Sequence, residues 1–191
     1  MNYQYWGVKP GQNVCRLGSV QNVEDDFQLL RGITRLTNWP ETASYFMDKE
    51  RKTHIRLEDC LWNVGSLLVV SEKVKNLLET EKLQNNEFLA VNIINHKDRL
   101  VKERYFILNQ IGLQDCIDLE RSEYKENRIN PEYFSIVKRL VIDERRIDPD
   151  VRLFRMKKYP KIPIVYRSLA QKLIDAGITG AKFGEVDQYA T

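Results

Sequence analysis

Apolar residues recur at regular intervals from Leu67 onward, and their spacing predicts a strand, a helix and a second strand in succession. Leu67–Val70 is a short apolar run. Ser71 follows it and is suited to begin a helix, because its hydroxyl can accept a hydrogen bond from a free backbone N–H. Apolar residues then continue at helical spacing as far as Leu78. Phe88–Ile94 is apolar on both alternating sets of positions, which is typical of a strand with two buried faces.

A similar succession recurs near the C-terminal end of the sequence. Ile162–Val165 predicts a strand, and Ala181–Val186 predicts another. Between them the spacing predicts a helix over Ser168–Ala176, and Gly177 stands where a left-handed helix terminus is usual. A shift of 95 positions superposes Val70 on Val165, Val74 on Leu169, Leu78 on Leu173, Phe88 on Phe183 and Val91 on Val186. Either this match is chance, or the two stretches are equivalent strand–helix–strand units.

The second explanation makes a prediction about packing. If the two units are equivalent, four residues on the equivalent strands should be buried in one core. They are Phe88, Val91, Phe183 and Val186. Replacing either phenylalanine by alanine would then lower the free energy of unfolding by about 3–5 kcal/mol, as is usual for a buried aromatic side chain.

Further strands are predicted along the rest of the chain. Leu100–Leu108 has the pattern of a returning hairpin strand, and Ser135–Ile142 and Val151–Met156 predict two more. The first sixty residues are less regular. In them we expect an opening strand at Tyr3–Val8 and a half-buried strand at Thr53–Leu57, where apolar and polar residues alternate.

These elements predict an α+β fold class. We expect a mixed, mostly antiparallel sheet with a few packing helices, in which the two strand–helix–strand stretches are candidate pseudo-repeats. No Gly/Ser-rich or Pro-rich linker interrupts the sequence, so residues 1–191 are expected to form a single globular domain. Within it, residues 1–60 would be a less regular N-terminal subdomain and residues 61–191 the main sheet region.

Composition excludes several classes of protein. The longest uncharged run, Cys60–Ser71, is too short to cross a bilayer, and residues 1–18 lack the basic start and apolar core of a secretory signal. Three cysteines without a CxxC pair argue against a disulfide framework and a zinc ribbon. The sequence therefore predicts a cytoplasmic protein without membrane association, and it specifies no homo-oligomeric state.

Motifs for catalysis or for a cofactor are absent from the sequence. It lacks the glycine-rich dinucleotide and P-loop patterns, the GxSxG nucleophile motif and the HExxH zinc motif. Only His54 and His96 could contribute an imidazole to a metal site or activate a thiol. A hydrolase that uses Cys60 or Cys116 is kept as a minor hypothesis. We predict no enzyme activity, no catalytic residue, no metal ligand and no cofactor.

A basic segment is the strongest compositional feature. Residues 138–167 carry ten positive charges, and residues 131–191 hold 12 lysines and arginines against 8 acidic residues. One interpretation is an electropositive face for an acidic partner or for nucleic acid, and the other is a solvated surface with interleaved acidic residues. Because the net charge is only +3 and no nucleic-acid-binding module is found, a nucleic-acid-associated regulatory protein is the alternative function and not the leading one.

Several segments, taken in order, resemble a known family. They are Asp59–Asn63, Leu68–Val74, Glu87–Val91, Tyr105–Asn109, Asp115–Ser122, Leu153–Lys157 and Leu173–Phe183. Together they resemble the immunity proteins of bacterial polymorphic-toxin systems, a family long catalogued as a domain of unknown function. The resemblance covers about Tyr45 to Val186. One departure is that the second helix begins with Tyr166-Arg167-Ser168, where the family repeats a Ser-Glu-like start.

The resemblance implies an immunity protein that binds a cognate bacterial toxin or effector in the cytoplasm and neutralises it by forming a complex, as in competition between bacteria. On this interpretation, the exposed part of the basic segment is the predicted contact with the toxin. The residues that we select are Arg145, Arg146, Lys157, Lys158 and Tyr159. Arginine and tyrosine dominate interface energetics, and the two basic pairs flank the strand predicted at Val151–Met156.

Overall fold

Two five-stranded sheets and two nine-residue helices hold most of the regular structure in residues 1–190, the residues that the computed structural model describes. In spatial order, the first sheet consists of β12 (Ala181–Glu185), β1 (Tyr3–Val8), β11 (Pro163–Tyr166), β10 (Leu153–Met156) and β7 (Leu113–Gln114). The second sheet consists of β2 (Ser44–Phe46), β5 (Asn86–Ile94), β6 (Tyr105–Gln110), β4 (Leu68–Ser71) and β3 (Cys60–Leu61). Neighbouring strands are antiparallel except in the pairs β10–β7 and β2–β5.

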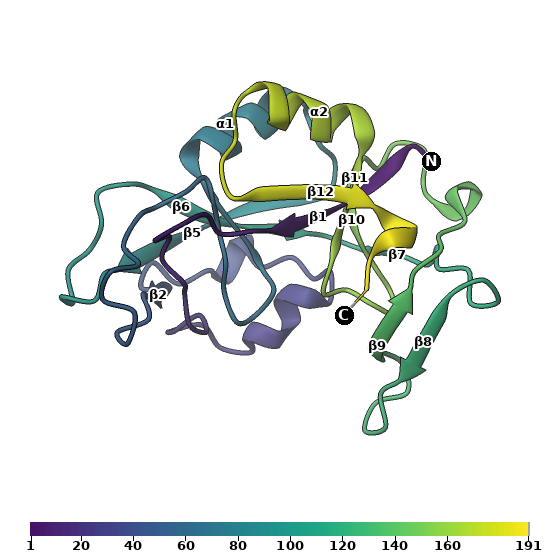
Figure 1. Cartoon of the computed structure of the whole chain (residues 1–191), viewed down its shortest axis with the longest axis horizontal. Coiled ribbons are helices and arrows are strands. Elements are labelled where there is room, and N and C mark those ends of the chain that lie inside the picture. The colour runs from purple at the N-terminus through teal and green to yellow at the C-terminus, as the bar shows by residue number, and fades with distance from the viewer. Residues whose placement is uncertain (191) are drawn as a thin grey trace.

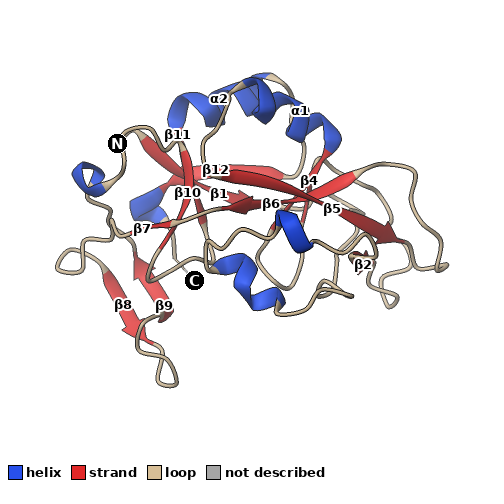
Figure 2. Ribbon diagram, turned by 180° about the vertical axis from the view of Figure 1, so that it is seen from behind, coloured by secondary structure: helices blue, strands red, loops and turns tan. Residues whose placement is uncertain are grey.

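The helices α1 (Glu72–Thr80) and α2 (Arg167–Asp175) lie side by side over one face of the sheets (Figure 1). A separate hairpin of β8 (Glu123–Glu126) and β9 (Phe134–Arg139) projects from one end of the molecule (Figure 2). Short 3-10 helices are η1 (Asp26–Leu30), η2 (Leu36–Asn38), η3 (Glu144–Arg146) and η4 (Val186–Gln188). Within residues 1–190, none of the helices has the length and apolar character needed to cross a membrane.

This architecture confirms the predicted α+β class and the mostly antiparallel sheets. It also shows two equivalent strand–helix–strand units. Adding 95 to the residue numbers of β4 and α1 gives the bounds of β11 and α2, and β5 and β12 likewise begin 95 positions apart. The shift detected in the sequence therefore reflects a structural repeat.

In each unit the first and the last strand both pair with one middle strand, and the register of this pairing is the same in the two units. In the second sheet β6 lies between β4 and β5, and in the first sheet β1 lies between β11 and β12. Val70 is opposite Phe106 of β6, and its equivalent Val165 is opposite Gln4 of β1. Strand β5 pairs with β6 in the same register in which β12 pairs with β1. The two middle strands enter from different places in the sequence: β6 directly follows its unit, whereas β1 comes from the opposite end of the chain.

An apolar cluster between the helices and the sheets joins the two units. It contains both members of three equivalent pairs: Val70 and Val165, Val74 and Leu169, and Leu78 and Leu173. Trp6 of β1 and Leu108 of β6, which hold equivalent positions on the middle strands, lie in the same cluster. We call this the shared cluster. Each unit thus buries its helix partly against the other unit.

The predicted common core of four residues is wrong. Phe88 and Phe183 are half-buried at the border of the shared cluster, whereas Val91 and Val186 are buried in two other clusters. Successive side chains of a strand point to opposite faces, so residues three positions apart, such as Phe88 and Val91, cannot enter the same cluster. Val186 lies beyond β12, in η4.

Two further apolar clusters lie against the sheets. One combines strands β4, β5 and β6 with residues from the irregular stretch 14–47. The other combines β1, β10 and β11 with the β8–β9 hairpin and η4. The irregular N-terminal stretch therefore covers one sheet, and β1, which precedes it in the sequence, forms the middle of the other sheet.

The strand predicted at Thr53–Leu57 is wrong. Only Arg56 takes part in strand pairing there, as a single bridge to Val14, and Ile55 is 54% exposed. Alternation alone predicts a half-buried strand, but a strand needs a neighbour that offers a ladder of hydrogen bonds, and this segment meets its neighbour at one position. The strand predicted at Leu100–Leu108 forms only from Tyr105.

Asp59 connects the two units by hydrogen bonds. Its carboxylate accepts one from the Ser71 hydroxyl at 2.7 Å and two from the N–H and hydroxyl of Thr179, each at 2.9 Å. Ser71 in turn caps α1 by accepting from a backbone N–H, as predicted from the sequence. Gly180 completes the turn that carries Thr179. Its φ is +76°, and a Cβ there would collide with the carbonyl oxygen of Cys60.

This network makes a pH-dependent contribution to stability. Burial raises the pKa of Asp59, but hydrogen bonds from Thr179 and Ser71 and the charge of Lys73 outweigh burial, so the pKa lies below its ordinary value. A lowered carboxyl pKa stabilises the fold above the unfolded-state pKa of about 4, and this stabilisation is lost as the pH falls through the folded-state value. We expect Asp59→Asn to lower the free energy of unfolding by about 1–3 kcal/mol at neutral pH.

The difference between wild type and Asp59→Asn is expected to shrink below about pH 4. Urea unfolding of both proteins at about pH 7 and about pH 3 measures it. Asp187→Asn, at an exposed carboxylate, is the matched control and should change stability by less than about 0.5 kcal/mol. A loss for Asp59→Asn that is equal at both pH values would show that the carboxylate charge has no part in holding the units together.

Candidate functional site

The two arginines selected from the basic segment lie in η3 and already have acidic partners. The Arg145 side chain, 89% exposed, contacts Asp143 at 2.9 Å, and its hydrogen bond lowers the pKa of Asp143 to about 2. Arg146 Nη2 lies 3.3 Å from a carboxylate oxygen of Asp115, and its Nη1 donates to the backbone oxygen of Ile117. Both guanidinium groups are thus partly neutralised within the chain.

The residues selected after β10 have different surroundings. Lys157 is exposed, and Lys158 is half-buried with its ammonium group 5.9 Å from the centroid of the Phe134 ring. Tyr159 is only 2% exposed, and its hydroxyl lies 3.4 Å from that of Tyr189. The structure therefore places Tyr159 in the core and leaves the two lysines accessible to a partner.

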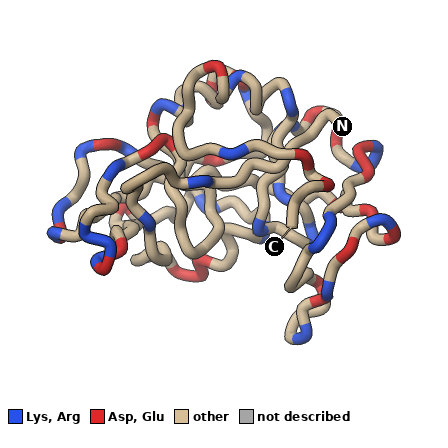
Figure 3. The backbone as a smooth tube through the Cα atoms, in the orientation of Figure 1, with Lys and Arg blue, Asp and Glu red and all other residues tan. Residues whose placement is uncertain are grey.

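Ion pairs divide the basic segment into two kinds of residue. Arg152 and Arg167 are ion-paired in the same way as the η3 arginines, and Arg155 is buried. Basic residues of the segment that form no ion pair with a described residue are Lys138, Arg139, Lys157, Lys158 and Lys161. Basic and acidic positions are interspersed over most of the chain (Figure 3). Four arginines of the segment are therefore partly neutralised within the chain, and residues 157–161 carry three of its five unpaired basic residues.

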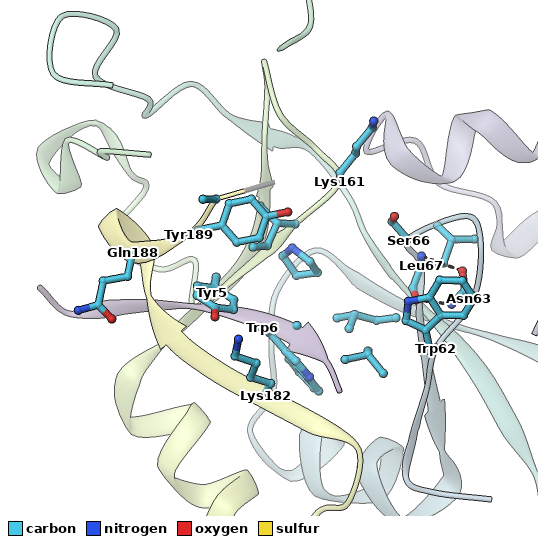
Figure 4. A pocket seen from close by; sticks show the side chains of 16 residues that line it. Tyr5, Trp6, Trp62, Asn63, Ser66, Leu67, Lys161, Lys182, Gln188 and Tyr189 are labelled. Atoms are coloured by element: carbon cyan, nitrogen blue, oxygen red, sulfur yellow. Dashed lines mark hydrogen bonds between the residues drawn. The ribbon is translucent and has the colours of Figure 1, made fainter. Parts of the chain in front are cut away.

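Two pockets adjoin this unpaired stretch. The larger has a volume of about 400 Å³ and lies between strands β1 and β12 and the loop that connects β3 to β4 (Figure 4). We call it the inter-sheet pocket; its lining includes Tyr5, Trp62, Lys161, Lys182 and Tyr189. The smaller, about 220 Å³, lies between η1 and the β8–β9 hairpin. We call it the hairpin pocket; its lining includes Phe27, Arg31, Tyr133, Phe134 and Lys161.

Every charged residue among the described residues that line these pockets is basic. Arg31, Lys161 and Lys182 are exposed, and none of them forms an ion pair with a described residue. The Arg31 guanidinium lies 4.8 Å from the centroid of the Phe27 ring, and the Lys182 ammonium lies 5.6 Å from that of Tyr5. Aromatic rings and unpaired cations thus surround Lys161, an arrangement that attracts carboxylates or phosphates.

Arg155 joins the loops that form the inter-sheet pocket. Its side chain is 1% exposed, and its guanidinium donates to the side-chain oxygen of Gln110 at 2.6 Å. It also donates to the backbone oxygen of Ser66, which lines the pocket, and to that of Pro160, which precedes the lining residue Lys161. Burial lowers the pKa of Arg155 to about 9, so the side chain is charged at neutral pH. One buried cation therefore holds a loop from each sheet in place.

The thiols offer no accessible nucleophile for the alternative hydrolase. Cys60 and Cys116 are completely buried, and burial raises the pKa of both, that of Cys116 to about 12. A thiol with a raised pKa stays protonated and unreactive at neutral pH. Within residues 1–190 there is also no group of three side chains suited to hold a metal ion.

Sequence reasoning missed several residues of these pockets. Phe27, Arg31, Trp62 and Lys182 lie far apart in the sequence, and only the folded chain brings them around Lys161. Trp62 directly follows strand β3 and lies 36% exposed between the buried residues Leu61 and Asn63. The sequence Leu61-Trp62-Asn63 does not indicate this, because the polar residue is the buried one.

Comparison with known proteins gives one family. The model described as "Immunity protein family (Imm11)" matches residues 8–188. This match confirms the resemblance that the ordered segments indicated, and it extends the similarity from about Tyr45 to Val8 on the N-terminal side. Among curated proteins, none matches the sequence.

Proposed function

We propose that this chain, which belongs to the immunity protein family Imm11, binds a cognate bacterial toxin and neutralises it by forming a protein–protein complex. The family match over residues 8–188 is the observation that carries the proposal. The complex would form in the cytoplasm, where the free thiols of Cys15, Cys60 and Cys116 remain reduced. The toxin would be a protein encoded beside this gene and delivered in competition between bacteria.

The chemistry of the surface supports neutralisation by binding. Around Lys161 the chain has accessible aromatic rings and cations, which are side chains that commonly contact a partner protein, while its thiols are buried. Of the contact residues that the sequence favours, we retain Lys157 and Lys158 in the proposal, because both are accessible and unpaired. Arg145 and Arg146 would first have to exchange their present acidic partners, and Tyr159 would have to leave the core.

Neutralisation can be tested by growth. Expression of the toxin domain encoded beside this gene is expected to arrest a bacterial host, and co-expression of this protein is expected to restore growth. The two purified proteins are expected to elute together in size-exclusion chromatography. A toxin from an unrelated system is the matched control and should arrest growth whether or not this protein is present.

Two results would contradict the proposal. Growth that stays arrested although this protein is folded and abundant would remove the immunity function. Growth that recovers while the two proteins never co-elute would remove the mechanism, because relief would then come from chemistry on the toxin or on its target.

A further inference from the structure

We infer that the surface around Lys161 is the toxin-binding site and that it receives an acidic segment of the toxin carrying a large apolar side chain. This inference rests on the proposed function. Lys161 lines both the inter-sheet pocket and the hairpin pocket, so the two pockets belong to one surface. The contact between the hydroxyls of Tyr159 and Tyr189 also connects the hairpin pocket to the inter-sheet pocket.

Charge complementarity points to an acidic occupant. Arg31, Lys161 and Lys182 have no carboxylate partner among the described residues, so toxin carboxylates would gain ion pairs here without breaking any. The arginines of η3 differ, because each would lose an existing pair first. Unpaired cations around a pocket also accelerate the approach of an oppositely charged protein.

Exposed aromatic rings point to an apolar side chain within that acidic segment. Trp62 is 36% exposed at the inter-sheet pocket, and Phe27 is 51% exposed at the hairpin pocket. Aromatic residues that border a concave site are the usual anchors of protein interfaces. The inter-sheet pocket, at about 400 Å³, has room for one large side chain of the toxin.

The site is largely formed before the toxin arrives. Arg155 fixes the backbone at Ser66, which lines the inter-sheet pocket, and at Pro160, which precedes the lining residue Lys161. Because these loops are already ordered, less conformational entropy is lost on binding, and more of the interaction energy contributes to affinity.

A protein fits this surface better than a nucleic acid does. Nucleic-acid binding relies on a track of cations that contacts about 6–10 phosphates. Here three cations line two concave, aromatic-lined pockets, and the unpaired Lys157 and Lys158 lie near Lys161 in the sequence. Four arginines of the basic segment are ion-paired. The pockets and the small number of cations favour insertion of side chains over contact with a phosphate backbone.

Binding kinetics of an inactive form of the toxin domain encoded beside this gene test the inference. Lys161→Glu/Lys182→Glu is expected to slow association about tenfold at about 50 mM NaCl, with a smaller effect at about 300 mM, because salt screens the charges. Trp62→Ala is expected to accelerate dissociation about tenfold or more, because it removes an apolar anchor. The matched control is Lys97→Glu/Lys102→Glu, which makes the same charge change on the β5–β6 loop and should alter either rate less than about threefold.

The outcomes separate this inference from the proposed function. If wild type does not bind the toxin, both are overturned. If wild type binds and the Lys161, Lys182 and Trp62 variants, shown to be folded by circular dichroism, bind equally well, only this inference is overturned. Fluorescence anisotropy with a short single-stranded DNA and a short RNA forms the second arm. Binding of either that is lost in Lys161→Glu/Lys182→Glu, with toxin binding unchanged, would assign the surface to nucleic acid and overturn the inference.

Discussion

Replacing Arg155 by alanine is expected to lower the free energy of unfolding by about 3–5 kcal/mol. The substitution removes a fully buried cation and leaves two buried oxygen acceptors, those of Gln110 and Pro160, without a donor and away from water. The backbone oxygen of Ser66, an exposed residue, also loses its donor. Each unsatisfied buried acceptor is destabilising by about 1–3 kcal/mol, and the vacated volume adds to the loss. Urea unfolding followed by circular dichroism measures the effect.

Arg155→Met separates the hydrogen bonds from the packing, since methionine restores most of the volume and none of the donors. We expect it to retain a loss of about 2–3 kcal/mol. In the double variant Arg155→Met/Gln110→Leu, part of that loss should be recovered, because one acceptor is removed together with its donor. Stability of Arg155→Met within about 0.5 kcal/mol of wild type would mean that the buried cation does not hold the two loops.

Trp6→Ala is expected to be similarly damaging, with a loss of about 3–5 kcal/mol in the free energy of unfolding. Trp6 is completely buried in the shared cluster, on the middle strand of the first sheet, and its ring lies 5.5 Å from that of Phe183. Phe183 itself is half-buried, so Phe183→Ala should lower stability by only about half as much. This revises the loss of about 3–5 kcal/mol that the sequence predicted for Phe183.

The structural repeat supplies the matched comparison for Trp6. Leu108 holds the equivalent position on β6, and Leu108→Ala is expected to lower stability by about 2–5 kcal/mol. Chemical denaturation of wild type and of the Trp6→Ala, Phe183→Ala and Leu108→Ala variants gives the order of their free energies of unfolding. A larger loss for Phe183→Ala than for Trp6→Ala would show that the shared cluster is centred on β12 and not on the middle strands.

The repeat could be predicted from the sequence because its signals are local. The cap at Ser71, the helical spacing that follows it and the strand Leu68–Ser71 each depend on neighbours within a few residues. The strand and the helical spacing have equivalents from Pro163 onward, whereas Tyr166 gives the second helix no side-chain cap. A local pattern predicts that a segment is a strand, but it does not show which other strand will pair with it. The place of β1 in the middle of the first sheet depends on pairing with residues that are more distant in the sequence than any others. That Thr53–Leu57 has no partner strand likewise depends on the tertiary fold and not on the local pattern.

The candidate site was predicted only in part for the same reason. Charge composition identified the segment that contains Lys157 and Lys158, and charge can be counted in a sequence. Whether a cation is already neutralised, as Arg146 is by Asp115, depends on a contact across the fold. The burial of Tyr159 and the meeting of Trp62 with Lys161 are likewise products of tertiary structure.

The position of β1 also imposes an order on folding during synthesis. Strands β4, β5 and β6 lie within residues 68–110, so the ribosome completes this unit early and it can pair at once. Strand β1, with Tyr3, Tyr5 and Trp6, emerges first but has no sheet to enter until residues 163–185 have been made. Closing so long a loop is slow, and during the delay an aromatic strand with unpaired edges is exposed to other chains. The nascent protein is therefore most vulnerable to aggregation at its first strand, and a chaperone that binds this strand would protect it until its partners exist.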